Sequence, residues 1–275
     1  MFIQPSPMPG LRLSAGITLT LLSLVVLAPV AALVAQGATL GPEGIWEAVN
    51  RPRVWAALWL SFRLSFLAAL VNLGLGLVIA WVLVRYRFPG RRLLDAAVDL
   101  PFALPTAVAG IALTALYAPN GLIGGWAKEI GWKIAYTQAG IFVALLFVGL
   151  PFAVRTVQPV IEEIDREVEE ASATLGANRL TTLIRVIWPM LMPAALTGFA
   201  LALARAVGEY GSVIFIAGNI PLKTEIAPLL IVIELEEFDY RGAAAIGLAM
   251  LVISFALLMA INLLQIWSRR RIGHV

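Results

Sequence analysis

The sequence predicts an all-α protein that crosses a membrane six times. Its 275 residues are 60% hydrophobic and only 13% charged, whereas an ordinary soluble domain carries roughly 25% charged residues. The apolar residues gather in runs of about 20 residues or more, the length that a helix needs to cross a hydrocarbon layer of roughly 30 Å. Most of this chain is therefore expected to lie in lipid.

Six apolar runs are long enough to serve as membrane-spanning helices. We place them at residues 12–36, 57–84, 98–118, 136–157, 194–217 and 243–267. An even number of spans puts both termini on one side of the membrane. That side carries about twice as many Lys and Arg residues as the other, so the positive-inside rule predicts that both termini are cytoplasmic.

The predicted spans divide the chain into three parts. Residues 1–56 hold a cytoplasmic segment, the first span and an external loop, residues 57–267 form one membrane domain with five helices, and residues 268–275 are a basic cytoplasmic tail. The first span is longer than the 7 to 15 residues typical of a signal-peptide core, and no clean small-x-small cleavage site follows it. We therefore interpret it as a retained span; its cleavage would leave five.

Several kinds of chemistry are excluded by composition. The chain has no cysteine, and its one histidine, His274, stands next to the C-terminus, so metal centres and catalytic triads are not expected. The net charge of +3 comes from basic residues dispersed in loops between apolar runs, which indicates membrane topology and not nucleic-acid binding. A membrane-embedded enzyme would need ionisable pairs inside its spans, and Arg205 with Glu209 is the one pair that we find.

The longest cytoplasmic connection lies between the fourth and fifth spans and predicts two short helices joined by a glycine turn. The first reads IEEIDREVEEASATLG, with acidic residues in its early turns, where they complement the helix dipole, and with Gly176 as a left-handed cap. Its apolar residues fall at helical spacing and predict one stripe, made of Ile161, Ile164, Val168, Ala171 and Leu175.

The second helix of this connection is LTTLIRVIW. Asn178 is placed to cap its start, and Pro189 and Pro193 are expected to end or kink it. Two interpretations of the helix pair stay open: an amphipathic hairpin that rests on the bilayer surface, or a segment that docks into another protein.

The spacing in this loop resembles a known motif. Glu170, Ala171 and Ser172, then Gly176 after three residues, and Val186 to Pro189 after nine more, are similar to the EAA loop of binding-protein-dependent ABC importer permeases. The family pattern is Glu-Ala-Ala, three residues, Gly, nine residues, Ile, any residue, Leu-Pro. The sequence departs from it at Ser172, Val186 and Trp188, with the glutamate, glycine and proline in register.

This resemblance implies the type I importer permease fold, which is MetI-like. It further implies that residues 159–193 form coupling helices that sit in a groove of a cytoplasmic ATPase. Glu170 would then make polar contacts with the ATPase, Ala171 would allow close approach, and Gly176 would supply a positive φ between the helices. The chain contains no Gly-x-x-x-x-Gly-Lys-Ser/Thr motif, so ATP and magnesium are expected on the partner and no cofactor on this chain.

A closer resemblance concerns the cargo. The segments DLPFALPTAVAGIAL, ARAVGEYGSVIFIAGNIPLKTEIAPLLI and EFDYRGAAAIGLAMLVISFALLMAINLLQ, together with the loop, are similar to sulfate and thiosulfate permeases of the T type. This similarity implies an inner-membrane subunit that imports sulfate and also thiosulfate. Its implied partners are a W-type permease, two copies of the ATPase and a periplasmic sulfate-binding protein.

Two other functions remain as alternatives. Molybdate and tungstate permeases share the Gly-Glu-Tyr/Phe-Gly and Ala-Gly-Asn-Ile-Pro elements with this sequence. A secondary anion transporter or channel, working without ATP, would not need the loop around Gly176.

Three residues are candidates for the translocation pathway. Arg205 lies deep in the fifth span, where an isolated charge is costly and should face a partner or an aqueous path. Glu209 follows four residues later on the same helix face, so the two side chains either line the pathway or neutralise each other. Pro105, with Pro101 and Gly110, is expected to kink the third span. Two explanations of this kink stay open: kinked helices often line translocation pathways, and a kink is also a common irregularity of helix packing.

Overall fold

The computed structural model describes the backbone of residues 11–272 and the side chains of residues 13–266, and within these limits it contains helices and no strands. Six helical segments are long and apolar enough to cross a membrane: Leu13–Ala38, Pro52–Arg85, Thr106–Glu129, Gln138–Glu163, Arg179–Val207 and Tyr240–Ile266. The prediction of an all-α protein with six spans is confirmed.

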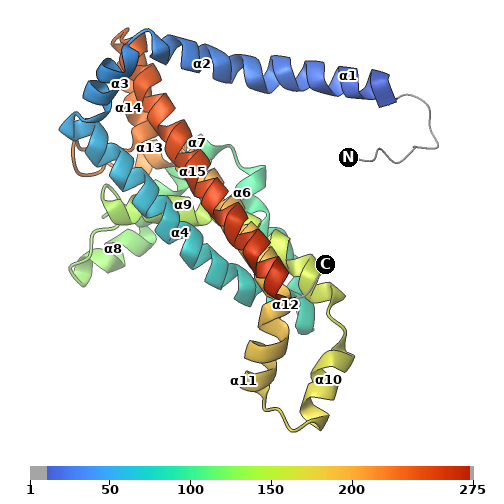
Figure 1. Cartoon of the computed structure of the whole chain (residues 1–275). Helices are drawn as coiled ribbons and strands as arrows, with labels where there is room; N and C mark the ends of the chain where they lie inside the picture. The colour runs from blue at the N-terminus through green and yellow to red at the C-terminus, as the bar shows by residue number, and fades with distance from the viewer. Residues whose placement is uncertain (1–10, 273–275) are drawn as a thin grey trace.

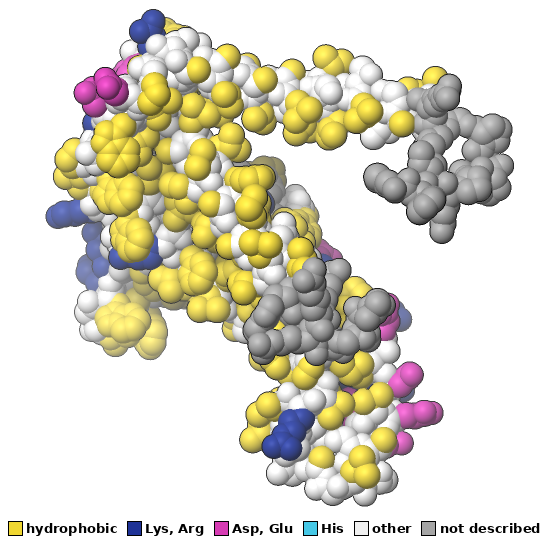
Figure 2. All heavy atoms as spheres, in the orientation of Figure 1, with side chains coloured by type: hydrophobic (Ala, Val, Ile, Leu, Met, Phe, Trp, Pro, Cys, Tyr) yellow, Lys and Arg dark blue, Asp and Glu magenta, His cyan; other side chains and the backbone are white. Residues whose placement is uncertain are grey.

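The first span forms an arm that projects away from the body of the molecule (Figure 1). It consists of α1 (Leu11–Leu22), a π-helical turn η1 (Ser23–Leu27) and α2 (Ala28–Ala38). None of its apolar window is buried, and only the end of α2 packs against α15 (Tyr240–Ile272). Figure 2 shows this arm covered by hydrophobic side chains.

The core lies between α4 (Pro52–Arg85), α9 (Gln138–Glu163) and α12 (Trp188–Val207). Small or polar residues form the buried stripe of α4: Ser61, Ser65, Ala68, Asn72, Gly76 and Ala80. A Cβ at Gly76 would lie 2.7 Å from the Cβ of Ala153, so only glycine allows this approach. Close backbone approach of this kind is how helices associate where lipid removes the hydrophobic driving force.

The third span is broken, and its predicted start was wrong. In place of one kinked helix over 98–118, the chain forms α5 (Arg91–Val98), α6 (Leu100–Ala103) and α7 (Thr106–Tyr117), with α8 (Leu122–Glu129) after a turn. Leu104 and Pro105 have extended backbones, with ψ values of 132° and 136°. Proline lacks the N–H that a helix needs and disfavours helical geometry in the residue before it, so the helix stops there.

The fifth span begins and ends earlier than the predicted 194–217. It starts at Arg179 in α11 (Arg179–Thr182), continues through a π turn, η2 (Leu183–Ile187), and ends with α12 at Val207. Pro189 therefore does not end the helix: it stands two residues after the π turn, as Pro29 does after η1. The wider turn relieves the loss of a backbone donor and the clash that proline imposes.

The remaining elements complete the body. They are α3 (Gly41–Val49), α10 (Arg166–Thr174), α13 (Val213–Ile216), α14 (Ala227–Glu236) and α15. The predicted tail at 268–275 is helical as far as Ile272, because α15 runs on without a break. His274 and residues 1–10 lie outside the described residues.

Candidate functional site

The loop between the fourth and fifth spans forms a helical hairpin at one end of the molecule (Figure 1). Its first arm is α10 and its second is α11, which continues into η2 and α12. The predicted first helix from Ile161 is in fact two helices, because the chain is extended at Ile164 and Asp165. The first three residues of that prediction, up to Glu163, end α9.

This break divides the predicted apolar stripe. Ile161 and Ile164 are buried in the body of the protein, whereas Ala171 is exposed and the side chain of Leu175 is 88% exposed. The prediction of one continuous stripe was wrong, because a continuous 3.6-residue period requires an unbroken helix.

The turn of the hairpin has the geometry that the sequence predicts. Gly176 has a φ of +82°, and a Cβ there would meet no atom within 4 Å, so the need for glycine is one of backbone conformation and not of space. Asn178 caps α11, its Oδ1 accepting a hydrogen bond from the Thr181 N–H at 2.8 Å. The two helices meet through a hydroxyl pair, Ser172 Oγ and Thr182 Oγ1, 2.8 Å apart and buried.

The other motif residues lie on the outside of the hairpin or at its base. Glu170 and Ala171 are exposed, and Val186 and Pro189 are half-buried in η2 and α12. Exposed apolar side chains surround the tip, contributed by Leu175, Leu180, Leu183 and Ile184. Figure 2 shows acidic side chains along the α10 side of this end.

Arg85 joins the hairpin to the end of α4. Its Nη2 donates a hydrogen bond to the carbonyl oxygen of Ile164 at 3.0 Å and forms an ion pair with Glu169 at 2.9 Å. Its guanidinium also lies 5.4 Å from the ring centroid of Trp81, a cation–π contact. The sequence marks Arg85 only as one basic residue among several, because its partners are about 80 positions away.

Arg205 and Glu209 form an ion pair, with 2.5 Å between Nη1 and Oε2. The Glu209 side chain is only 2% exposed, whereas that of Arg205 is 32% exposed. The second carboxylate oxygen of Glu209 accepts hydrogen bonds from the backbone N–H and the hydroxyl of Ser212, at 2.8 and 2.9 Å. Glu209 thus anchors the turn between α12 and α13 and neutralises the neighbouring guanidinium.

The break before α7 and the turn between α12 and α13 lie against each other. A Cβ at Gly110 of α7 would come within 2.5 Å of the Ser212 carbonyl oxygen, and one at Gly211 within 2.2 Å of Thr106 Oγ1. Pro105 begins α7 at this point. Two interruptions of helical backbone therefore meet inside the protein.

A second arginine network holds α5 against α9. Arg155 donates hydrogen bonds to Asp99, Asp95, Gln158 and the Asp95 carbonyl, at 2.6 to 2.9 Å. The Arg155 guanidinium holds the pKa of the Asp99 carboxyl below its usual range by hydrogen bonding. This network could not be predicted from the sequence, because Arg155 is 56 positions from Asp99 and 60 from Asp95.

No group of three or more metal-ligating side chains occurs among the described residues. The fold and the site define a polytopic membrane protein with a helical hairpin at one end and two helix interruptions in contact within it. Residues 72–274 match the family described as "Binding-protein-dependent transport system inner membrane component". The chain belongs to this family.

Relatives extend this assignment over nearly the whole chain. The sequence is 48% identical over 268 residues to "Sulfate transport system permease protein CysT" of Escherichia coli (strain K12), covering 97% of each chain. It is also 48% identical over 254 residues to the protein of that name from Synechocystis sp. (strain ATCC 27184 / PCC 6803 / Kazusa), covering 92% of this chain and 89% of the relative.

Solved structures support the fold. A chain of a bacterial alginate ABC transporter, crystallised with an alginate-bound periplasmic protein, aligns with a TM-score of 0.77 at 16% identity and covers 96% of this chain and 95% of its own. A chain of the MetNI methionine ABC transporter aligns with a TM-score of 0.55 at 20% identity, covering 82% of this chain and 100% of its own. The MetI-like permease fold expected from the sequence is confirmed.

Proposed function

We propose that this chain is the permease subunit of an ATP-driven importer of sulfate, and that thiosulfate takes the same route. The observation that carries the proposal is the 48% identity to sulfate permeases over 97% of the chain. Molybdate or tungstate transport has no support among these relatives.

The coupling to ATP is assigned to the hairpin of α10 and α11. Its tip exposes leucine and isoleucine side chains with polar residues of the α10 side next to them, as expected of a surface that a partner protein covers. A cytoplasmic ATPase, present in two copies and holding ATP and magnesium, is the partner that we propose. Glu170, Ala171 and Gly176 would contact it or shape the contact, as the motif implies.

A second permease is the proposed neighbour of the first span. The arm of α1 and α2 offers an apolar surface with no protein contact over most of its length, although a lone helix of this kind gains by packing on another. A W-type subunit that accepts this arm would complete the membrane part of the transporter. A periplasmic sulfate-binding protein would deliver the anion to the opposite end.

The orientation follows from the charges. The hairpin end carries Arg85, Arg87, Arg91 and Arg92 beside the arginines of the hairpin, and we place this end and both termini in the cytoplasm of a cell with the chain in its inner membrane. Gln265 near the end of α15 bonds to Thr197 of α12 at 3.2 Å, so the last helix runs toward this same end.

The pathway is proposed to follow the paired breaks next to Pro105 and Gly211. Arg205 lies just before the second break, and its partly exposed guanidinium would lower the barrier for a divalent anion. Glu209, nearly fully buried, would hold the turn in place without contact to the cargo.

Uptake of labelled sulfate tests the proposal. Cells that lack the chain should not accumulate sulfate, cells given the chain back should, and excess thiosulfate should compete while molybdate should not. Equal competition by molybdate would favour the alternative cargo. Sulfate movement by the chain without any ATPase would favour the secondary transporter.

A further inference from the structure

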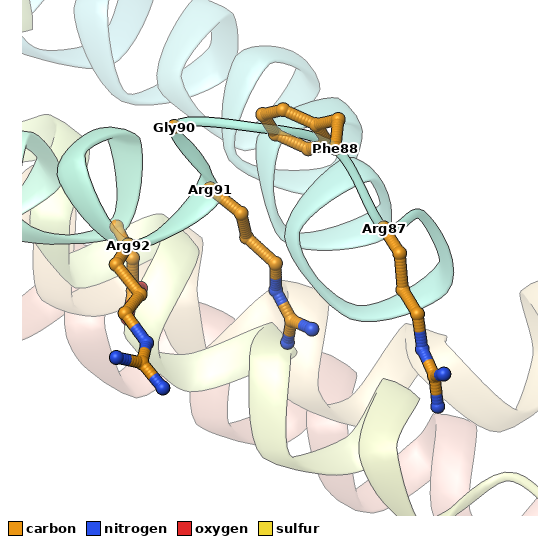
Figure 3. A pocket seen from close by; sticks show the side chains of 6 residues that line it. Arg87, Phe88, Gly90, Arg91 and Arg92 are labelled. Atoms are coloured by element: carbon orange, nitrogen blue, oxygen red, sulfur yellow. The ribbon is translucent and has the colours of Figure 1, made fainter.

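The turn between α4 and α5 carries three arginines that surround one cavity. The cavity, of about 570 Å³, is lined by Arg87, Phe88, Gly90, Arg91, Arg92 and Asp95. Figure 3 shows the side chains of Arg87, Arg91 and Arg92 extending in the same direction from the two sides of the turn. Gly90 permits this arrangement, because its φ of +86° turns the chain sharply from the end of α4 into α5.

These arginines outnumber the acidic residue of the cavity wall, Asp95. The Asp95 carboxylate accepts a hydrogen bond of 2.6 Å from Arg155, which also pairs with Asp99, so two carboxylates share that guanidinium and one negative charge stands beside three arginines. Arg87, Arg91 and Arg92 take part in none of the ion pairs that the described part of the chain forms. The cavity therefore presents three guanidinium groups without an ion-pair partner, which together favour the binding of an anion.

Exposed apolar side chains follow these arginines along the chain. Leu93 is 76% exposed, and Leu94 and Leu100 are also exposed. Leu93 and Leu94 belong to α5, which starts six residues after the end of α4. Since α4 has 34 residues and is one of the membrane spans, α5 lies next to the end of a span. An amphipathic segment at the end of a span, with leucines beside arginines, is suited to the boundary between acyl chains and headgroups.

We propose that this cavity binds the phosphate of an anionic phospholipid headgroup, with the acyl chains lying along Leu93 and Leu94. Guanidinium groups match phosphate oxygens with paired N–H donors. A headgroup that also carries an amine would bring a positive charge toward the arginines, so a net negative lipid is preferred. The proposal depends on α4 spanning the membrane and not on the transport function.

The network around Arg155 keeps this lipid site in shape. All five N–H donors of its guanidinium are used on Asp95, Asp99 and Gln158, so α5 is fixed against α9 and cannot turn its arginines away. A lipid bound here would also stabilise α5 and α6, which lead to the break at Pro105.

The test is lipid binding to the purified full-length chain, counted by native mass spectrometry in a non-ionic detergent. Phosphatidylglycerol, phosphatidylcholine and inorganic phosphate are titrated separately and in competition. Each arginine near an anionic lipid contributes roughly fivefold in affinity. The combined variant Arg87→Gln, Arg91→Gln and Arg92→Gln should therefore bind phosphatidylglycerol on the order of a hundredfold more weakly than the unchanged chain.

Matched variants separate the site from general charge effects and from misfolding. Lys128→Gln, Lys133→Gln and Arg241→Gln remove three exposed charges from other parts of the chain and should leave lipid binding unchanged. Arg87→Gln alone lies in the extended link outside any helix, so it weakens binding without disturbing α5.

Three results would overturn the proposal. Equal binding of phosphatidylcholine would remove the preference for a net negative headgroup, and displacement of phosphatidylglycerol by equimolar inorganic phosphate would make this a site for small oxyanions. Unchanged lipid binding by the triple variant, together with loss of a co-purifying protein, would make the surface a protein contact.

Discussion

Ser172 and Thr182 join the two arms of the hairpin through a buried hydroxyl pair, 2.8 Å apart. Ser172 stands where the family motif has a second alanine, so this bond is available only because the sequence departs from the motif. The Thr182 hydroxyl has a second acceptor, the Asn178 carbonyl oxygen at 3.2 Å, which leaves Ser172 as the donor to Thr182.

The two residues should therefore differ in what their removal costs. Ser172→Ala leaves Thr182 bonded to Asn178 and should cost about 1 kcal/mol of stability, whereas Thr182→Val strands the buried Ser172 hydroxyl and should cost about 1–3 kcal/mol. The double variant should be no worse than Ser172→Ala alone. Thermal unfolding of the purified chain gives the three values, and strictly additive losses would show that the hydroxyls do not interact.

Gly176→Val should abolish transport and the coupling of ATP hydrolysis while leaving membrane insertion intact. A β-branched residue strongly resists the φ of +82° that the turn requires, whereas asparagine tolerates it, so Gly176→Asn should keep most of the activity. Gly131 has a φ of +81° outside the hairpin, and Gly131→Val is the matched control for backbone strain. Normal uptake by Gly176→Val would remove the hairpin from the mechanism.

Arg85→Gln should loosen the hairpin from α4 and lower ATP-driven uptake. The change removes a charged hydrogen bond to Ile164 and an ion pair to Glu169, with a loss of about 1.5–3 kcal/mol. Glu169→Gln should weaken the same junction, and Glu167→Gln, an exposed acid of the same helix, should not. Protease sensitivity of the hairpin is the direct measurement, and equal sensitivity of all three variants would contradict the junction.

Arg205→Gln should destabilise the chain by about 3–5 kcal/mol, because it leaves the carboxylate of Glu209 buried and unpaired. Adding Glu209→Gln removes that charge and keeps an acceptor for Ser212, so the double variant should recover normal abundance. Sulfate uptake should stay low in the double variant if Arg205 serves the anion. Full recovery of uptake would limit Arg205 to balancing the charge of Glu209.

Acidification should weaken the attachment of α5 to α9, because it protonates Asp99 and removes its ion pair with Arg155. The hydrogen bond from Arg155 lowers the pKa of Asp99 in the folded chain, so its contribution to stability is complete above the ordinary pKa of aspartate and is lost as pH falls through the lowered value. The difference in unfolding temperature between the unchanged chain and Asp99→Asn should thus shrink in acid. A difference independent of pH would contradict this role of Asp99.

Much of the fold could be predicted because lipid imposes simple length and composition rules. Four of the six spans overlap the predictions over most of their length, and Gly176 and Asn178 have the turn and cap roles that their residue types favour. The errors in the bounds of the third and fifth spans lie at prolines. Pro105 breaks a helix and Pro189 does not, and the difference is that a π turn precedes Pro189, which a local sequence pattern does not reveal.

The site was less predictable because its contacts join distant parts of the chain. The Arg205–Glu209 pair is four residues apart and could be foreseen from helix geometry, whereas Arg85 with Ile164 and Arg155 with Asp99 connect residues that only the packing of α4, α5 and α9 brings together. Gly110 and Gly211, at the contact between α7 and the turn before α13, are also required only because of atoms from distant parts of the chain that lie against them.

The central claim is that this chain moves sulfate only when an ATPase acts on the hairpin around Gly176. The most direct measurement is sulfate accumulation in proteoliposomes that contain the chain with its second permease and sulfate-binding protein, with and without the ATPase and ATP. We expect accumulation only when both ATPase and ATP are present. Equal accumulation in their absence would contradict the account.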